Sequence, residues 1–269
     1  METKSRKKLI TVLTAVLLPV VLAAGILIFY TAEIKKDMQA LAADGLAAVQ
    51  AHSTVQKLDA GAYADMRLGS ERVHVEQYAV SGLGNLAVKT SHTALTHSVS
   101  FVLTPFGKNV PLCALHETVT PGKRKTSAAF YDLVGDTATP AYQQVTETLR
   151  LAAVRYADAE ELAGEPHWYD SFLSTSLYKQ FRGKEKPRSR EMFLDMLNAY
   201  LAVSGQAEPA AEADAARQIE ITQNFCSSLI EKGSAETDLF RDTLGAEETL
   251  RFFYQVYFGT DCNREYAPS

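Results

Sequence analysis

The pattern of apolar and polar positions begins with a long apolar segment. Residues 9–30 contain no charged side chain. At about 1.5 Å of rise per residue, a helix of this length crosses roughly 30 Å of hydrocarbon. We therefore predict a basic N-terminal tail over residues 1–8 and a transmembrane helix or signal anchor over residues 9–30.

The charges beside this apolar segment indicate its orientation. Four cations lie within residues 4–8, whereas only Lys35 and Lys36 follow closely. Because positive residues favour the cytoplasmic side, we expect a single-pass protein with a cytoplasmic N-terminus and an extracytoplasmic domain. A secretory apolar region is usually about 7 to 15 residues long, which favours an uncleaved anchor. A plastid targeting sequence is the alternative.

The remaining periodicities predict one α+β domain. Helical spacing over residues 31–58 predicts an amphipathic helix. Short β-type runs joined by turn clusters of hairpin length follow at residues 72–80, 86–90, 95–103, 110–119 and 125–134. Helical spacing returns at residues 141–157, 168–177, 189–203, 210–231 and 246–258. This order predicts that residues 59–269 form an α/β/α sandwich, a central antiparallel sheet covered by helices on both faces.

Composition excludes two classes of site. The formal net charge is −5, whereas a nucleic-acid-binding domain needs a basic surplus. The three cysteines, Cys113, Cys226 and Cys262, show no C-x-x-C spacing. The sequence therefore predicts no nucleic-acid partner, no metal site and no disulfide framework.

Two stretches of the sequence resemble the ferredoxin-dependent bilin reductases. The first contains His97-Ser-Val-Ser-Phe101, Pro111-Leu112, Pro121-Gly122 and Ser127-Ala128-Ala129, and the second contains Phe225-Cys226, Leu244-Gly245-Ala246-Glu247 and Val256-Tyr257-Phe258. The resemblance covers most of residues 95–259. It implies that a linear tetrapyrrole such as biliverdin lies between the sheet and the C-terminal helices and is reduced with electrons from ferredoxin, without a bound cofactor.

The resemblance also implies proton donors beside the tetrapyrrole. His97 falls where some members carry an active-site histidine. On the next strand His116 falls at the position of the family's central aspartate, and a register shift of one residue puts Glu117 there instead. Histidine, or a carboxylate whose pKa is raised by burial, suits this role. Because adjacent strand residues face opposite sides, we expect His97 and either His116 or Glu117 to line one cavity.

Cations are expected to bind the propionates of the tetrapyrrole. Arg182 lies near the family's arginine, Lys179 is the second choice, and Lys232 is the nearest cation to a lysine before the penultimate helix. In that turn Gly233, Ser234 and Ala235 replace the family's acid. Three hypotheses follow: a bilin reductase, a non-catalytic membrane-anchored tetrapyrrole-binding protein, or an interaction domain without a pocket between the sheet and the C-terminal helices.

Overall fold

The computed structural model describes residues 31–162 and 166–265. The predicted tail and apolar segment, residues 1–8 and 9–30, lie outside these ranges. Within the described part of the chain, no helix has both the length and the apolar character needed to cross a membrane.

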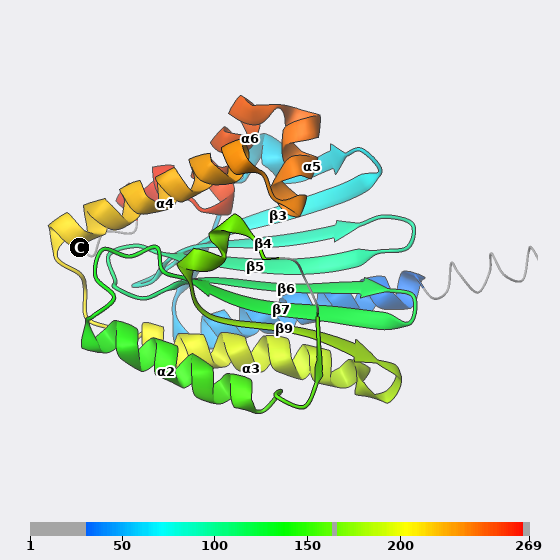
Figure 1. Ribbon diagram of the computed structural model, residues 1–269. Coiled ribbons are helices and arrows are strands. Elements are labelled where there is room, and N and C mark those ends of the chain that lie inside the picture. The colour runs from blue at the N-terminus through cyan, green and yellow to red at the C-terminus, as the bar shows by residue number, and fades with distance from the viewer. Residues whose placement is uncertain (1–30, 163–165, 266–269) are drawn as a thin grey trace, which may run out of the picture.

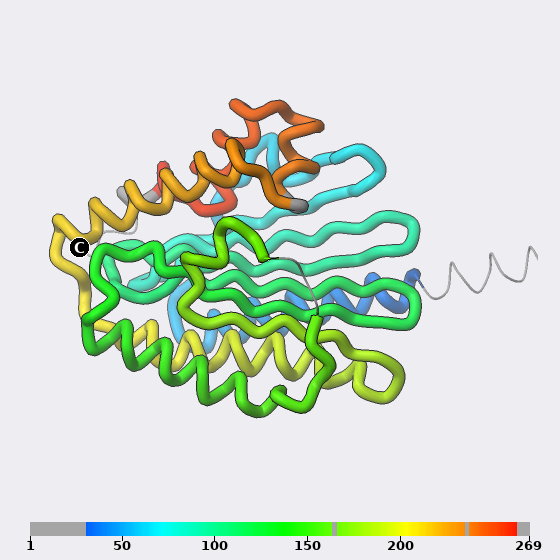
Figure 2. Tube along the Cα trace, viewed as in Figure 1, coloured from blue at the N-terminus to red at the C-terminus, as the bar shows by residue number. Residues whose placement is uncertain are grey.

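A nine-stranded antiparallel sheet forms the centre of the domain (Figure 1). Five strands form a meander, in which each pairs with the next: β3 (Glu71–Val80), β4 (Gly84–His92), β5 (His97–Pro105), β6 (Leu112–Thr120) and β7 (Lys123–Tyr131). The Cα trace shows these strands running back and forth (Figure 2). The predicted antiparallel meander is confirmed.

Further strands extend the sheet on both sides of the meander. At one edge β1 (Val55–Leu58) and β2 (Asp65–Leu68) both pair with β3. At the other, β9 (Leu173–Arg182) pairs with β7, and β8 (Glu160–Glu161) pairs with β9. Short 3-10 turns connect or end the elements: η1 (Gly61–Tyr63), η2 (Trp168–Phe172), η3 (Gly183–Glu185) and η5 (Thr260–Glu265).

Helices cover both faces of the sheet. The first helix (residues 31–52), α2 (Pro140–Val154) and α3 (Lys186–Ser204) pack on one face. The other face is covered by α4 (Glu212–Lys232), α5 (Ala235–Leu244), α6 (Ala246–Phe252) and the π-helix η4 (Phe253–Tyr257). Figure 1 shows α2 and α3 together on one side and α4 to α6 together on the other. The predicted sandwich of a sheet between helical layers is confirmed.

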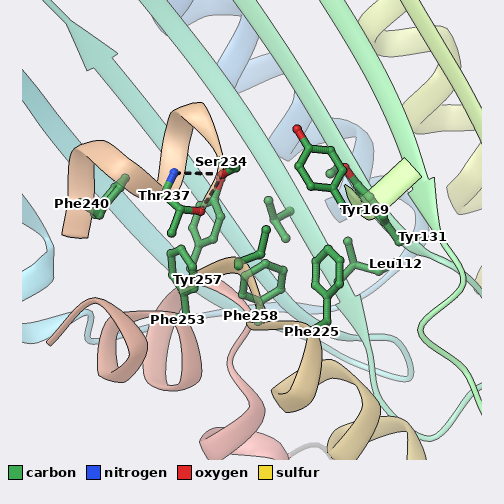
Figure 3. Close-up of a pocket in the computed structure, with 13 residues that line it drawn as sticks. Leu112, Tyr131, Tyr169, Phe225, Ser234, Thr237, Phe240, Phe253, Tyr257 and Phe258 are labelled. Atoms are coloured by element: carbon green, nitrogen blue, oxygen red, sulfur yellow. Dashed lines mark hydrogen bonds between the residues drawn. The ribbon is translucent and has the colours of Figure 1, made fainter. Parts of the chain in front are cut away.

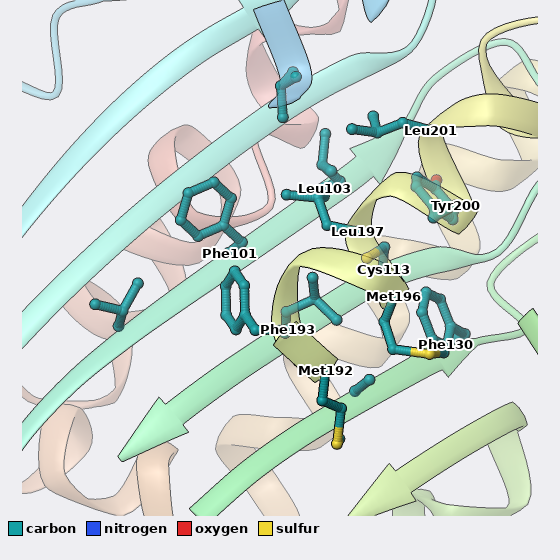
Figure 4. Packing of buried hydrophobic residues seen from close by; sticks show 14 of the residues in the cluster. Phe101, Leu103, Cys113, Phe130, Met192, Phe193, Met196, Leu197, Tyr200 and Leu201 are labelled. Carbon is teal, nitrogen blue, oxygen red and sulfur yellow. The ribbon is translucent and has the colours of Figure 1, made fainter. Parts of the chain in front are cut away.

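Alternation along the strands builds two separate cores. On β5, Phe101 and Leu103 belong to the core under α3, whereas Val102 belongs to the core under α4 to α6. The rings of Phe101 and Phe193 of α3 pack edge to face, with 5.4 Å between the ring centres (Figure 4). Burial of a large apolar side chain contributes about 1.5–3 kcal/mol, so these contacts hold α3 on the sheet.

Two element predictions were wrong. The predicted helix over residues 168–177 is a 3-10 turn followed by strand β9. Leu177, Lys179 and Phe181 are buried at every second position, which is the period of a strand. Pairing with β7 along this segment stabilises the strand in place of the predicted helix. The first helix also ends at residue 52, because residues 55–58 pair with β3 as β1.

Candidate functional site

An apolar pocket lies between the sheet and the C-terminal helical layer. Its volume is about 250 Å³, and it is lined by Val102, Leu112, Ala114, Tyr131, Tyr169, Phe225, Leu229, Ser234, Thr237, Phe240, Phe253, Tyr257 and Phe258. Figure 3 shows Tyr131 and Tyr169 on one side, and Ser234, Thr237 and Phe240 on the other. The pocket therefore combines an aromatic wall with a few hydroxyl groups, the arrangement typical of a small-molecule site. It contradicts the hypothesis of an interaction domain without such a pocket.

Two buried amides fix the helical wall of this pocket. Asn85 on β4 donates from Nδ2 to the carbonyl oxygens of Val256 (3.1 Å) and Tyr257 (3.4 Å). Gln77 on β3 donates to Asn85 Oδ1 and to the carbonyl oxygen of Gln255, both at 2.8 Å. π-Helices are rare in proteins, and those that occur are often found at functional sites. Here the amides pair with its carbonyl groups and hold Tyr257 against the sheet.

His116 lies on the sheet face that carries the pocket. It is two residues beyond Ala114 on β6, so both side chains point to the same side. Its Nδ1 lies 2.6 Å from Ser100 Oγ, and its Nε2 lies 2.6 Å from Thr118 Oγ1. Both ring nitrogens thus have hydroxyl partners, which fix the orientation of the imidazole next to the apolar pocket.

Lys89 is a residue of this face that the sequence analysis did not single out. Strand pairing aligns Lys89, Ser100 and His116 directly across β4, β5 and β6. Lys89 is only 5% exposed, and its Nζ lies 5.7 Å from the ring centre of Phe240 and 5.9 Å from that of Tyr257. The available signal was a lysine that directly follows the apolar run Leu86-Ala87-Val88 inside a strand with no other Lys, Arg, Asp or Glu. A cation therefore lies beside two aromatic rings of the pocket wall.

His97 lies on the opposite face of the sheet. Pairing places it opposite Val119, and both side chains point toward the first helix. Its ring stacks on the ring of His92, with 5.8 Å between the ring centres. Burial, His92 and Lys35 together lower the pKa of His97. The expectation that His97 shares a cavity with His116 is therefore wrong, because the two side chains are on different faces.

Glu117 faces the same side as His97 but does not join it in a cavity. Its carboxylate is 0% exposed under α3 and accepts from Arg124 (2.9 Å) and from Ser189 Oγ (3.0 Å). Arg124 also pairs with Asp37 of the first helix. Burial raises the pKa of Glu117, and the contacts with Arg124 and Ser189 oppose that rise. Through these contacts Glu117 and Arg124 join α3 and the first helix to the sheet.

The three cations predicted to bind propionates lie apart. Lys179 of β9 is 1% exposed and lies on the sheet face that α2 covers. It donates to the carbonyl oxygen of Ala159 and pairs with Glu161. Arg182, at the far end of β9 from the pocket, is exposed and lies 3.4 Å from Glu160. Lys232, at the end of α4, is the one nearest the pocket.

The turn between α4 and α5 places Lys232 beside Trp168 and two residues before Ser234, which lines the pocket. Its Nζ lies 4.7 Å from the ring centre of Trp168, whose indole donates to the Gly233 carbonyl oxygen at 2.9 Å. Ser234 follows as the N-cap of α5 and accepts from the Thr237 amide at 3.1 Å. Among the described residues that line the pocket, none is a carboxylate or a histidine.

Comparison with known proteins supports the fold. The chain matches no protein-family model and no curated protein sequence. Among solved structures, it is similar to phytochromobilin synthase from tomato, which was crystallised with selenomethionine in complex with biliverdin. The TM-score is 0.68 at 11% identity, over 86% of this chain and 85% of that chain. The sequence resemblance to bilin reductases thus holds at the level of the fold, which this chain shares with the tomato synthase.

Proposed function

We propose that the protein binds a linear tetrapyrrole, such as biliverdin, in the pocket between the sheet and α4 to α6. The observation that carries this proposal is the aromatic, hydroxyl-bearing pocket in a fold shared with a biliverdin complex. Flat aromatic walls suit a conjugated pyrrole chain, and hydroxyl groups suit its lactam ends. Lys89 lies beside Phe240 of the pocket wall and Lys232 lies two residues before Ser234 of the pocket lining, so these two cations are the candidates to meet the propionates.

The proposal includes reduction of the bound tetrapyrrole, with electrons from ferredoxin or a similar donor. His116 is then the proton donor, because its ring is held on the pocket face by Ser100 and Thr118. A histidine titrates near neutral pH and can pass a proton to a reduced intermediate. His97 and Glu117 take no part in the proposed reaction, since both face the other helical layer.

The size of the pocket sets a condition on this proposal. Pockets that enclose drug-sized ligands usually measure about 300–1,000 Å³, and this one measures about 250 Å³. A tetrapyrrole therefore requires the aromatic side chains of the helical wall to rearrange, or α5 to move outward. Amide exchange in α5 should change when biliverdin binds.

A non-catalytic tetrapyrrole-binding protein is the second candidate function. The observation that favours it is the pocket lining, which contains Ser234 and Thr237 but no carboxylate among the described residues. Such a protein would bind the pigment and leave its oxidation level unchanged.

One absorption experiment separates the two candidates. The full-length chain in mild detergent is mixed with biliverdin, and its spectrum is recorded before and after addition of a ferredoxin reducing system. A bound spectrum that then shifts supports the reductase, and a bound spectrum that stays constant supports the binding protein. Absence of any bound spectrum contradicts both.

A further inference from the structure

A second cavity lies on the opposite face of the sheet, between the start of the first helix and strands β2 to β5. It measures about 580 Å³. Pairing places Arg67, Arg72, His92 and His97 in one continuous row across four strands. Lys35 of the first helix also lines the cavity. This row is separate from the apolar pocket, which lies beyond the sheet.

The charges of this cavity are unbalanced. Lys35, Arg67 and Arg72 carry permanent positive charge, whereas Asp65 is the one carboxylate among the described lining residues. Asp65 is engaged with His74, at 2.9 Å between Oδ1 and Nδ1. Within residues 31–162 and 166–265, the three permanent cations form no ion pair. Like charges directly opposite each other across strands destabilise a sheet.

A buried ring nitrogen also lacks a partner here. His97 is only 6% exposed, and its Nε2 has no hydrogen-bond partner among the described residues. Buried polar groups are normally satisfied, so such a nitrogen calls for an explanation. A ligand atom in the cavity would supply one. Metal chemistry is not favoured, since no group of three potential ligands is found in the described part of the chain.

We propose that this cavity binds a doubly charged oxyanion, such as a phosphate group, between Lys35, Arg72 and the stacked imidazoles of His92 and His97. Guanidinium and ammonium groups bind phosphate through charge-assisted hydrogen bonds. The phosphate belongs either to a small molecule or to a phospholipid headgroup. The cavity volume leaves room for more than a bare ion.

The two histidines give the site a pH response. Burial, Lys35 and Arg72 lower the pKa of His92, and Glu71 opposes them. For His97 the lowering comes from burial, His92 and Lys35. The neighbouring cations repel protonated imidazoles, whereas a bound dianion attracts them and raises the pKa of both histidines. The dianion therefore binds more tightly at lower pH. A pKa increase of one unit corresponds to about a tenfold gain in affinity.

Equilibrium dialysis of the full-length chain in maltoside detergent tests the site with inorganic phosphate. Lys35→Gln and Arg72→Gln should each weaken binding about tenfold or more. Lys36→Gln is the matched control, because Lys36 is the next residue on the helix, is exposed and pairs with Glu33. It should bind like the wild type. Equal binding by all four proteins would overturn the site.

A second arm identifies the source of the phosphate. The chain is placed in phosphatidylcholine bicelles with or without phosphatidate, and the pKa of His97 is followed by imidazole NMR. A rise of about one unit with phosphatidate that exceeds the rise with inorganic phosphate assigns a lipid headgroup. A rise with inorganic phosphate that equals or exceeds the rise with phosphatidate supports a small molecule. No change with either anion would refute the proposal.

Inorganic sulfate isolates the contribution of the protein to the pH response, because sulfate stays doubly charged throughout the range. Its affinity should rise about tenfold between roughly pH 8 and roughly pH 6 as the imidazoles gain protons. Arg72→Gln, at an exposed position, should weaken sulfate binding at both pH values. Affinity that does not depend on pH would exclude the two histidines from the site.

Discussion

Ser100 and His116 lie directly opposite each other on β5 and β6, with 2.6 Å between Ser100 Oγ and His116 Nδ1. Thr118 Oγ1 approaches the other ring nitrogen at the same distance. A ring held at both nitrogens loses little further freedom when a substrate arrives. Preorganisation of this kind suits a proton donor, because its position is fixed before the reaction.

Replacing His116 by Gln should separate binding from reduction. We expect the rate of bilin reduction to fall about 10²–10⁴-fold, the usual contribution of a positioned acid, with the biliverdin-bound spectrum retained. Single-turnover absorption under anaerobic conditions measures the rate. His52→Gln, at an exposed position on the first helix, should react like the wild type. An unchanged rate in the His116 variant would remove this residue from the mechanism.

Filling the apolar pocket should abolish pigment binding. Ala114 lines the pocket from β6, and Ala114→Phe puts a ring into a space of about 250 Å³. Overpacking of this kind costs about 1–3 kcal/mol of stability, so the variant should remain folded. Titration with biliverdin should show no bound spectrum. Val154→Phe adds a ring at an exposed position of α2 and should bind normally.

Sequence reasoning predicted the meander and both helical layers, because β3 to β7 and α2 to α4 carry strong period-two or helical patterns. It failed on the faces of the catalytic candidates. In a hairpin the turn fixes which residues are opposite, and here His97 pairs with Val119. His97 therefore shares a face with odd-numbered residues of β6 and not with His116. The irregular turn of residues 106–111 contains no pattern from which that register could be derived.

The two tyrosines of the pocket were missed for another reason. Tyr131 comes from the end of β7 and Tyr169 from a 3-10 turn, and they meet only because β9 returns beside β7. That return depends on β9, which was predicted as a helix. A site assembled from distant segments cannot be located when one of its strands is assigned wrongly.

Asn85 should be essential for the π-helix wall. Asn85→Leu leaves two carbonyl groups of residues 256–257 and the Gln77 amide without their present partner. Each buried polar group left unsatisfied costs about 1–3 kcal/mol. Urea unfolding should show a loss of this size or larger, together with weaker biliverdin binding. Asn198→Leu is the control, because Asn198 is exposed and, among the described residues, its side chain bonds to the Leu194 carbonyl oxygen of its own helix. Equal stability of the two variants would contradict the role of Asn85.

Glu117 should give the fold a measurable dependence on pH. Burial raises its pKa above the ordinary value of 4.5, so the folded state holds a proton more readily than the unfolded state. The stability contributed by this group is therefore complete below about pH 4.5 and is lost as the pH rises through the folded-state pKa. Glu117→Gln cannot titrate, so the free energy of unfolding of the wild type minus that of the variant should decrease with rising pH. Urea unfolding of both proteins across this range measures it.

Glu147→Gln supplies a control of opposite sign. Arg150 lowers the pKa of Glu147 on the surface of α2, so this carboxylate contributes stability above about pH 4.5 and loses it as the pH falls. Its wild-type-minus-variant difference should increase slightly with rising pH, within the small range of a surface ion pair. Because all other titrating groups are common to each pair of proteins, their contributions cancel in the differences. If the Glu117 difference also increased with pH, the charge on Glu117 would be stabilising, and Arg124 and Ser189 would outweigh the cost of its burial.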